Sequence, residues 1–438
     1  MVFQQKLLEK DNLLKNSKYT LSANLINQIS SLMIFLVVPN ILSTDDYAKT
    51  VFLSVLMSFM VLSDFGMSFV YSRKMPSVYH DNNLEKIEAY NQTFFWFRLI
   101  MSISGSIVIG LIYFFKYHEF INSLILFFLN PLSLLITFFI SQHSVREDFK
   151  VYKDINIKNS FAKLFIVPFS YLFGLSGWIF GQLLASSLVI KSLKGTVLLS
   201  REKFDFKLIK NNTFEALILL ANFFFWNQLL NSGRLFASTS YEHTVIVQYG
   251  LVNAGYSLLL GLITSIFLPV TIASLKIMHK DPKGAIKQIF KTVIKTSAII
   301  AIVVIIAIEV APYLYEIFFP KYEVNLQILE YQLLSLVFIP IIATFGNIFL
   351  GMKKPIILVL IYGVSFVVGY SVFLLIDLDI ISASFAQFVG MNFLGVLLLT
   401  SVFYFFYEHI ENKLMKFIQI FSITTFPYLL YFSLRSFI

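Results

Sequence analysis

The hydrophobic positions of this chain come in long blocks that are separated by short polar gaps. Each block holds about 20 residues, the length that an α-helix needs to cross about 30 Å of hydrocarbon. The pattern predicts an all-α polytopic membrane protein with about twelve spans. The predicted spans are 19–41, 48–70, 92–115, 120–141, 159–175, 177–195, 213–235, 244–275, 293–316, 325–350, 355–376 and 380–405.

A further apolar segment, residues 417–434, follows the twelfth span. It contains Pro427 and barely reaches the length of a span, so it could cross the membrane, lie in the interface or pack along the bundle. We expect that it does not cross completely and forms a membrane-associated tail.

Lysine and arginine residues gather in every second gap between the predicted spans. The sixth gap contains Lys203 and Lys207, and the eighth contains Lys283 and Lys287, whereas the third and ninth gaps carry Glu119 and Glu323. Because basic residues favour the cytoplasmic side, this alternation predicts a cytoplasmic N-terminus. The first 18 residues are polar and basic, and no small-residue cleavage site follows them, so we expect the N-terminus to stay attached.

The composition excludes several other classes of protein. Hydrophobic residues make up 57% of the 438 positions and charged residues 13%, against about 25% charged residues in soluble domains. The net charge of +9 is scattered over short loops and forms no continuous stripe for nucleic acid. There is no cysteine, no phosphate-binding loop and no metal-ligand spacing among the six histidines, so we expect no cofactor. An enzyme remains only as a membrane-embedded sugar polymerase or transferase, and we expect none.

The longest polar stretch in the middle of the chain, residues 200–212, divides the spans into two sets of six. We therefore expect an N-lobe (1–199), a cytoplasmic linker (200–212), a C-lobe (213–405) and a tail (406–438). A weak internal sequence similarity supports duplication of a six-span unit, because Ser43-Thr44 after the first span resembles Ser238-Thr239 after the seventh. Parallel repeats of this kind are a known plan for transporters.

Several short segments resemble the polysaccharide flippases of bacteria, which share a superfamily with multidrug extruders and the lipid II flippase. They are residues 39–47 (PNILSTDDY), 63–66 (SDFG), 73–74 (RK), 267–269 (FLP), 318–322 (FFPKY) and 346–354.

This resemblance implies two six-helix lobes around a central cavity that opens alternately to each side of the inner (cytoplasmic) membrane. The implied cargo is an undecaprenyl-diphosphate-linked oligosaccharide, moved from cytoplasm to periplasm for O-antigen, capsule or exopolysaccharide assembly. Membrane lipids, a polysaccharide polymerase and a chain-length regulator are the implied partners. The alternative is an ion-coupled multidrug extruder of the same fold. Many relatives carry an acidic residue followed by Arg in the seventh span, where this chain has Asn227-Gln228.

Polar side chains recur at steps of three and four residues on three predicted spans, which places each set on one helix face. Amides, hydroxyls and aromatic rings bind sugars, so these stripes are candidate cargo-binding positions. Alternatively, the amides bond neighbouring helices to one another. The candidates are Asn24, Asn27 and Gln28 on the first span, Asn227, Asn231 and Arg234 on the seventh, and Tyr249, Asn253 and Tyr256 on the eighth.

Ionisable residues inside the spans are candidates for handling the cargo or an ion, because each is costly at membrane depth unless it is paired or hydrated. Arg98 could grip the diphosphate, or Arg98 and Asp64 could neutralise each other. Arg234 could pass the diphosphate outward, or it could snorkel to the outer interface. Glu309 and Asp64 could exchange a proton or a sodium ion; otherwise Glu309 bonds a neighbouring helix in its protonated form.

Overall fold

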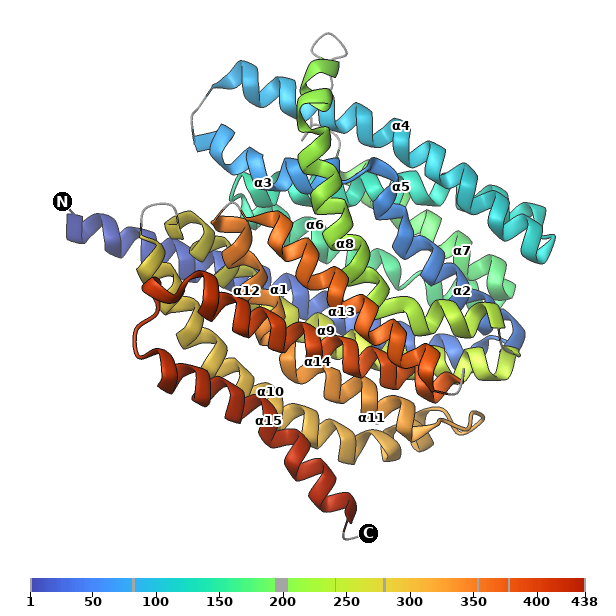
Figure 1. Cartoon of the computed structure of the whole chain (residues 1–438). Helices are drawn as coiled ribbons and strands as arrows, with labels where there is room; N and C mark the ends of the chain where they lie inside the picture. Colours follow the sequence, from blue (N-terminus) through green and yellow to red (C-terminus); the bar gives the residue numbers. More distant parts are fainter. Residues whose placement is uncertain are drawn as a thin grey trace. The chain divides into compact units, whose positions relative to one another are not determined.

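The computed structural model describes the backbone of residues 2–80, 83–193, 204–240, 242–278, 281–352, 354–376 and 379–436 (Figure 1). Every regular element in these ranges is a helix, which confirms the predicted all-α class. Eleven of the described helices are long and apolar enough to cross a membrane. The chain forms two compact units, residues 1–224 and 225–438, and each is described by itself.

The first unit begins at the N-terminus and ends inside α8. Its elements are α1 (Val2–Ile41), α2 (Thr44–Phe59), η1 (Met60–Asp64), α3 (Met67–His80), α4 (Leu84–Tyr117), α5 (Phe120–Val145), α6 (Phe149–Lys163), α7 (Ile166–Ser192) and the first part of α8 (Phe206–Ser240).

The second unit contains the rest of α8 and all later elements. These are α9 (His243–Met278), α10 (Pro282–Phe318), α11 (Leu326–Ser335), η3 (Leu336–Phe338), α12 (Ile339–Gly351), α13 (Pro355–Leu375), α14 (Ile380–Phe405), η4 (Tyr407–His409) and α15 (Lys413–Ser436).

The boundary between the units lies within a helix, downstream of the predicted linker. Residues 200–203 of that linker are outside the described residues, and from residue 206 onward the chain is already helical. The first part of α8 is held in the first unit by Glu215, whose carboxylate oxygens lie 2.9 Å from Arg73 Nη1 and 2.7 Å from Lys74 Nζ. These ion pairs explain why residues 206–224 belong with α3.

Helix α7 is folded back on itself at Gly174. That residue has φ 58° and ψ −135°, a backbone conformation that is open almost only to glycine. Beyond it, a Cβ on Gly177 would overlap the carbonyl oxygen of Phe169, and one on Gly181 would lie 2.8 Å from Ile166 Cα. The two legs, 166–173 and 175–192, are therefore antiparallel and in close contact. Dividing α7 at Gly174 supports the predicted spans 159–175 and 177–195, with α6 continuing the fifth.

The connections of the first unit alternate between its two ends. At one end, Lys49 Nζ lies 2.8 Å from Glu119 Oε1, and Asp46 lies against Gly174. At the other end, Arg146 Nε donates to the Tyr79 hydroxyl at 2.6 Å. Successive membrane-spanning segments thus run in opposite directions, as expected of a multi-pass membrane protein, and one such segment consists of α6 with the first leg of α7. This alternation follows from the contacts alone and does not depend on the distribution of charged residues in the loops.

The segment from α11 to α12 forms the centre of the second unit. Phe338, Phe345 and Phe349 on it are buried, and Pro340 stands at the start of α12, directly after the turn η3. Because proline cannot donate a backbone hydrogen bond, the break between α11 and α12 falls beside it. The apolar tail forms α15, which lies along α10 (Figure 1).

We predict that Gly177→Ala destabilises the protein, because its methyl group overlaps the backbone of Phe169 and the two legs of α7 must separate. The expected loss is about 1–3 kcal/mol, measured as a lower thermal midpoint in detergent. Gly346→Ala is the matched control, since its nearest neighbour would lie at 3.6 Å. Equal midpoints for the two variants would contradict the hairpin.

Candidate functional site

The two buried charges of the first unit, Asp64 and Arg98, lie close enough to attract each other. The Asp64 carboxylate accepts hydrogen bonds from the backbone N–H groups of Gly66 at 3.1 Å and Ser68 at 3.3 Å. Phe65 (φ 52°) and Gly66 (φ 80°) turn the chain so that these N–H groups face Asp64. The local sequence SDFG therefore builds a carboxylate site at the start of α3.

Arg98 approaches this carboxylate from α4. Its Nη2 donates to Thr137 Oγ1 on α5 at 2.7 Å, while its Nε has no hydrogen-bond partner among the described residues. Only 7% of Arg98 and 3% of Asp64 are exposed. This burial favours mutual neutralisation of the two charges over an Arg98 that faces open space.

The polar stripe on α1 divides into two kinds of position. Asn27 Oδ1 accepts a hydrogen bond from Ser160 Oγ on α6 at 3.4 Å, so this amide links two helices. Asn24 and Gln28 are partly exposed. Their role in binding a cargo stays a prediction.

The stripe on α8 forms a ladder in the second unit. Asn231 Nδ2 donates to Asn227 Oδ1 at 2.8 Å, and Arg234 Nη1 donates to Asn231 Oδ1 at 3.2 Å. Each amide orients the next, and the guanidinium stands at the end of the series. The predicted spacing therefore brings these three side chains together.

The stripe on α9 turns toward α11 and α14. Tyr249 and Tyr256 are fully buried; the Tyr249 hydroxyl lies 3.5 Å from Gln387 Oε1, and the Tyr256 hydroxyl lies 3.5 Å from Ser335 Oγ. Asn253 Nδ2 donates to Ser257 Oγ at 3.3 Å on its own helix. The α8 and α9 stripes meet where Gly233 lies directly against the Tyr249 hydroxyl.

The sequence prediction did not name three further buried polar residues of the second unit, namely Glu330, Gln332 and Gln387. All three are buried, and amide atoms of both glutamines lack hydrogen-bond partners among the described residues. Glu330 Oε2 accepts a hydrogen bond from the Tyr431 hydroxyl at 2.5 Å. Each of the three is a polar residue inside an apolar block, and that signal could have identified them.

Glu309 lies apart from these clusters. Its side chain is on an exposed face of α10, together with Ile306 and Val310. The structure thus places it away from a helix contact, and its coupling to a proton or sodium ion stays a prediction. Among the described residues, no three His, Cys, Asp or Glu side chains gather where they could hold a metal ion.

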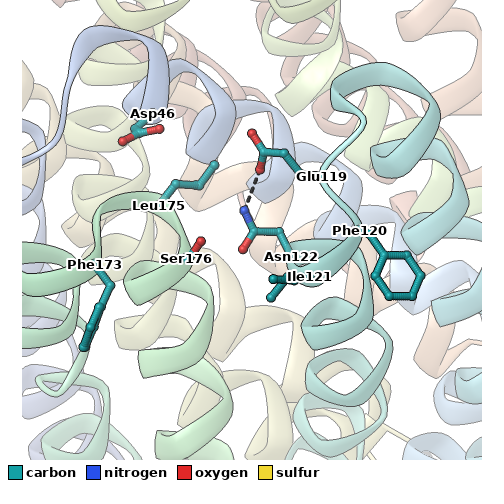
Figure 2. Close-up of a pocket in the computed structure, with 8 residues that line it drawn as sticks. All are labelled: Asp46, Glu119, Phe120, Ile121, Asn122, Phe173, Leu175 and Ser176. Carbon is teal, nitrogen blue, oxygen red and sulfur yellow. Dashed lines mark hydrogen bonds between the residues drawn. The ribbon is translucent and has the colours of Figure 1, made fainter.

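A pocket of about 490 Å³ lies at the end of the first unit where Asp46, Glu119, Asn122, Phe173 and Ser176 meet (Figure 2). None of the predicted cargo-binding residues lines it. Burial would raise the pKa of Glu119, but hydrogen bonds from Lys49, Tyr113 and Asn122 outweigh burial and lower it below the ordinary value. Glu119 therefore holds α2, α4 and α5 together as an anion.

Comparison with solved structures identifies the fold. No protein-family model matches this sequence, and no curated protein matches it. The lipid II flippase MurJ in an inward-closed conformation has a TM-score of 0.64 at 15% identity, with 96% of this chain and 98% of that chain covered.

Two multidrug and toxin extrusion (MATE) transporters are similar to the chain over a comparable length. An inward-facing multidrug resistance MATE family transporter of the MOP superfamily gives a TM-score of 0.64 at 13% identity, covering 94% and 96% of the two chains. A mutant of the Vibrio cholerae MATE transporter VcmN gives 0.62 at 14% identity, covering 92% and 98%. The chain therefore has the two-lobed helical fold of MATE transporters and MurJ.

We predict that Arg98→Met alone destabilises the first unit, because it leaves the Asp64 carboxylate buried without its opposite charge. Removing one partner of a buried pair costs about 3–5 kcal/mol, and the double variant Asp64→Asn with Arg98→Met should recover much of this loss. Thermal unfolding of the three variants in detergent measures the coupling. A stable Arg98→Met protein that no longer transports would instead assign Arg98 to the cargo.

We also predict a pH-dependent contribution from Glu119. Since its folded-state pKa is lowered, its stabilising effect is complete above its unfolded pKa of about 4.3 and is lost as the pH falls through the folded-state value. The difference in thermal midpoint between wild type and Glu119→Gln should therefore be constant from about pH 7 to 5 and shrink below about 4.3. Glu323→Gln is the control for removing an exposed carboxylate. A difference that grows on acidification would contradict the prediction.

Proposed function

We propose that this chain is a flippase that moves an undecaprenyl-diphosphate-linked oligosaccharide from the cytoplasmic to the periplasmic leaflet by alternating access. The observation that carries the proposal is the ladder of Asn227, Asn231 and Arg234 beside the buried hydroxyls of α9. Amides and hydroxyls suit a sugar, and a guanidinium suits a diphosphate, because its planar set of donors binds two phosphate oxygens at once.

The charges of the interior support this cargo over an organic cation. A drug extruder is expected to offer an unpaired carboxylate to its substrate. Here the buried Asp64 interacts with Arg98, and the buried Glu330 accepts a hydrogen bond from Tyr431. Arg234 is only partly buried, and Asn231 orients its guanidinium through a hydrogen bond to Nη1.

Both cargoes are compatible with the fold, since the similar structures include a flippase of lipid II and multidrug transporters. The placement in the inner membrane with a cytoplasmic N-terminus belongs to the same proposal and is supported by the basic residues in alternate gaps. Assembly of O-antigen, capsule or exopolysaccharide would then use the translocated unit.

A substitution series at Arg234 tests the proposal. Arg234→Gln should slow translocation about tenfold or more, because a charge-assisted hydrogen bond contributes about 1.5–3 kcal/mol, and Arg234→Lys should retain part of the rate. Lys321→Gln, which removes an exposed cation from the connection 319–325, is the control and should transport normally. The measurement is exposure of a lipid-linked oligosaccharide on the far leaflet of proteoliposomes at matched protein content.

Deletion of the gene gives an independent readout. Loss of surface polysaccharide with lipid-linked units accumulating inside supports the proposal. Normal polysaccharide combined with sensitivity to cationic drugs would overturn it in favour of the multidrug extruder.

A further inference from the structure

Helix α15 is fixed by polar contacts at both of its ends. Just before its first turn, Glu411 Oε2 lies 2.8 Å from Lys287 Nζ, in the second turn of α10. Near its last turns, the Tyr431 hydroxyl donates to Glu330 Oε2 at 2.5 Å, in the second turn of α11. Both partners belong to the α10–α11 hairpin.

These two partners lie at opposite ends of that hairpin. Lys287 is near the start of α10, whereas Glu330 follows the connection 319–325 that joins the far end of α10 to α11. Helix α15 begins at Lys413, and the 18 residue steps from there to Tyr431 rise about 27 Å, close to the thickness of about 30 Å of the hydrocarbon layer. Figure 1 shows α15 running beside α10.

The surface of α15 has the character of a spanning helix. No charged residue occurs between Lys416 and Arg435, whereas a helix that lies in the interface carries a charged face. The Thr424 and Thr425 hydroxyls donate to backbone carbonyls of the preceding turn, so these polar groups are satisfied without water. Most of its exposed large side chains are apolar, and Gln419 is the exposed polar one among the described residues; the apolar ones are Leu414, Met415, Ile418, Phe421, Phe426, Leu429 and Phe432.

Two polar residues of α15, Thr424 and Tyr428, face the protein, whereas Gln419, Ser422 and Ser433 are exposed. Thr424 is fully buried, and the Tyr428 hydroxyl donates to Leu334 O at 2.9 Å and also contacts Asn392 Oδ1. Both residues lower the mean hydropathy of the segment, although they contact the protein and not lipid. A count of residue types along the sequence therefore understates how apolar the outer face is.

We propose that α15 crosses the bilayer as an additional span, with its apolar face against lipid acyl chains. The chain after residue 436 then emerges on the same side of the membrane as the connection 319–325, opposite to η4. This inference reverses the expectation from sequence that residues 417–434 do not cross, and it holds for either cargo.

Single-cysteine labelling tests the topology, because the natural chain contains no cysteine. Lys283→Cys and Glu323→Cys provide references for the two sides, and Glu408→Cys and a cysteine added after residue 438 are the test positions. In intact cells, a membrane-impermeant maleimide should label the added cysteine in the same way as Glu323→Cys, and Glu408→Cys in the same way as Lys283→Cys. An added cysteine that follows Glu408→Cys would overturn the proposal. Labelling of all four after permeabilisation controls for reactivity.

A pair of lysine substitutions tests the contact with lipid. Phe421 lies midway between the two anchored ends and is exposed, so Phe421→Lys should lower the amount of folded protein by about tenfold or more. Leu414→Lys is the matched control at the end of the helix, where Lys413 and Lys416 already lie, and should accumulate normally. Equal accumulation of both variants would overturn the proposed burial of this face in hydrocarbon.

Discussion

Hydrocarbon offers no hydrogen-bond partners, and this constraint governs the structure of the whole chain. It requires helices, because only they satisfy the backbone within each segment. It also requires that polar side chains find partners inside the protein, as Asp64 does with the N–H groups of Gly66 and Ser68, and as Glu330 does with Tyr431. The hydroxyls on exposed helix surfaces follow the same requirement, since Thr425 donates to a carbonyl of its own helix.

The spans could be predicted from the sequence because each depends on local composition alone, including the paired spans on either side of Gly174. Local composition could not show that the first compact unit extends into α8, where Glu215 forms ion pairs with the distant Arg73 and Lys74. The course proposed for α15 rests on its contacts with α10 and α11, which hydropathy does not reveal because it averages over all faces of a helix. The spacing on α8 correctly grouped Asn227, Asn231 and Arg234, but it could not show that Gln332 and Gln387 join the α9 stripe from other helices.

The similarity to MurJ and MATE transporters at identities of 15% and below shows how little the fold depends on particular residues. Apolar helices, small residues at close contacts and a few satisfied polar groups suffice to specify it. Function therefore has to be argued from the side chains that the fold does not need. Arg234 is a candidate for such a residue, because Asn231 orients its guanidinium on a partly exposed part of α8.

Helix α8 is one uninterrupted element that belongs to both units. Glu215 ties its beginning to α3, and its later turns carry Arg234. Between Ala216 and Ser232 the helix contains neither glycine nor proline, so it lacks the residues at which helices usually bend. Glu215 and Arg234 are therefore joined by about five turns of one continuous helix. The carboxylate that binds Arg73 and Lys74 and the guanidinium that Asn231 orients thus depend on the continuity of the same element.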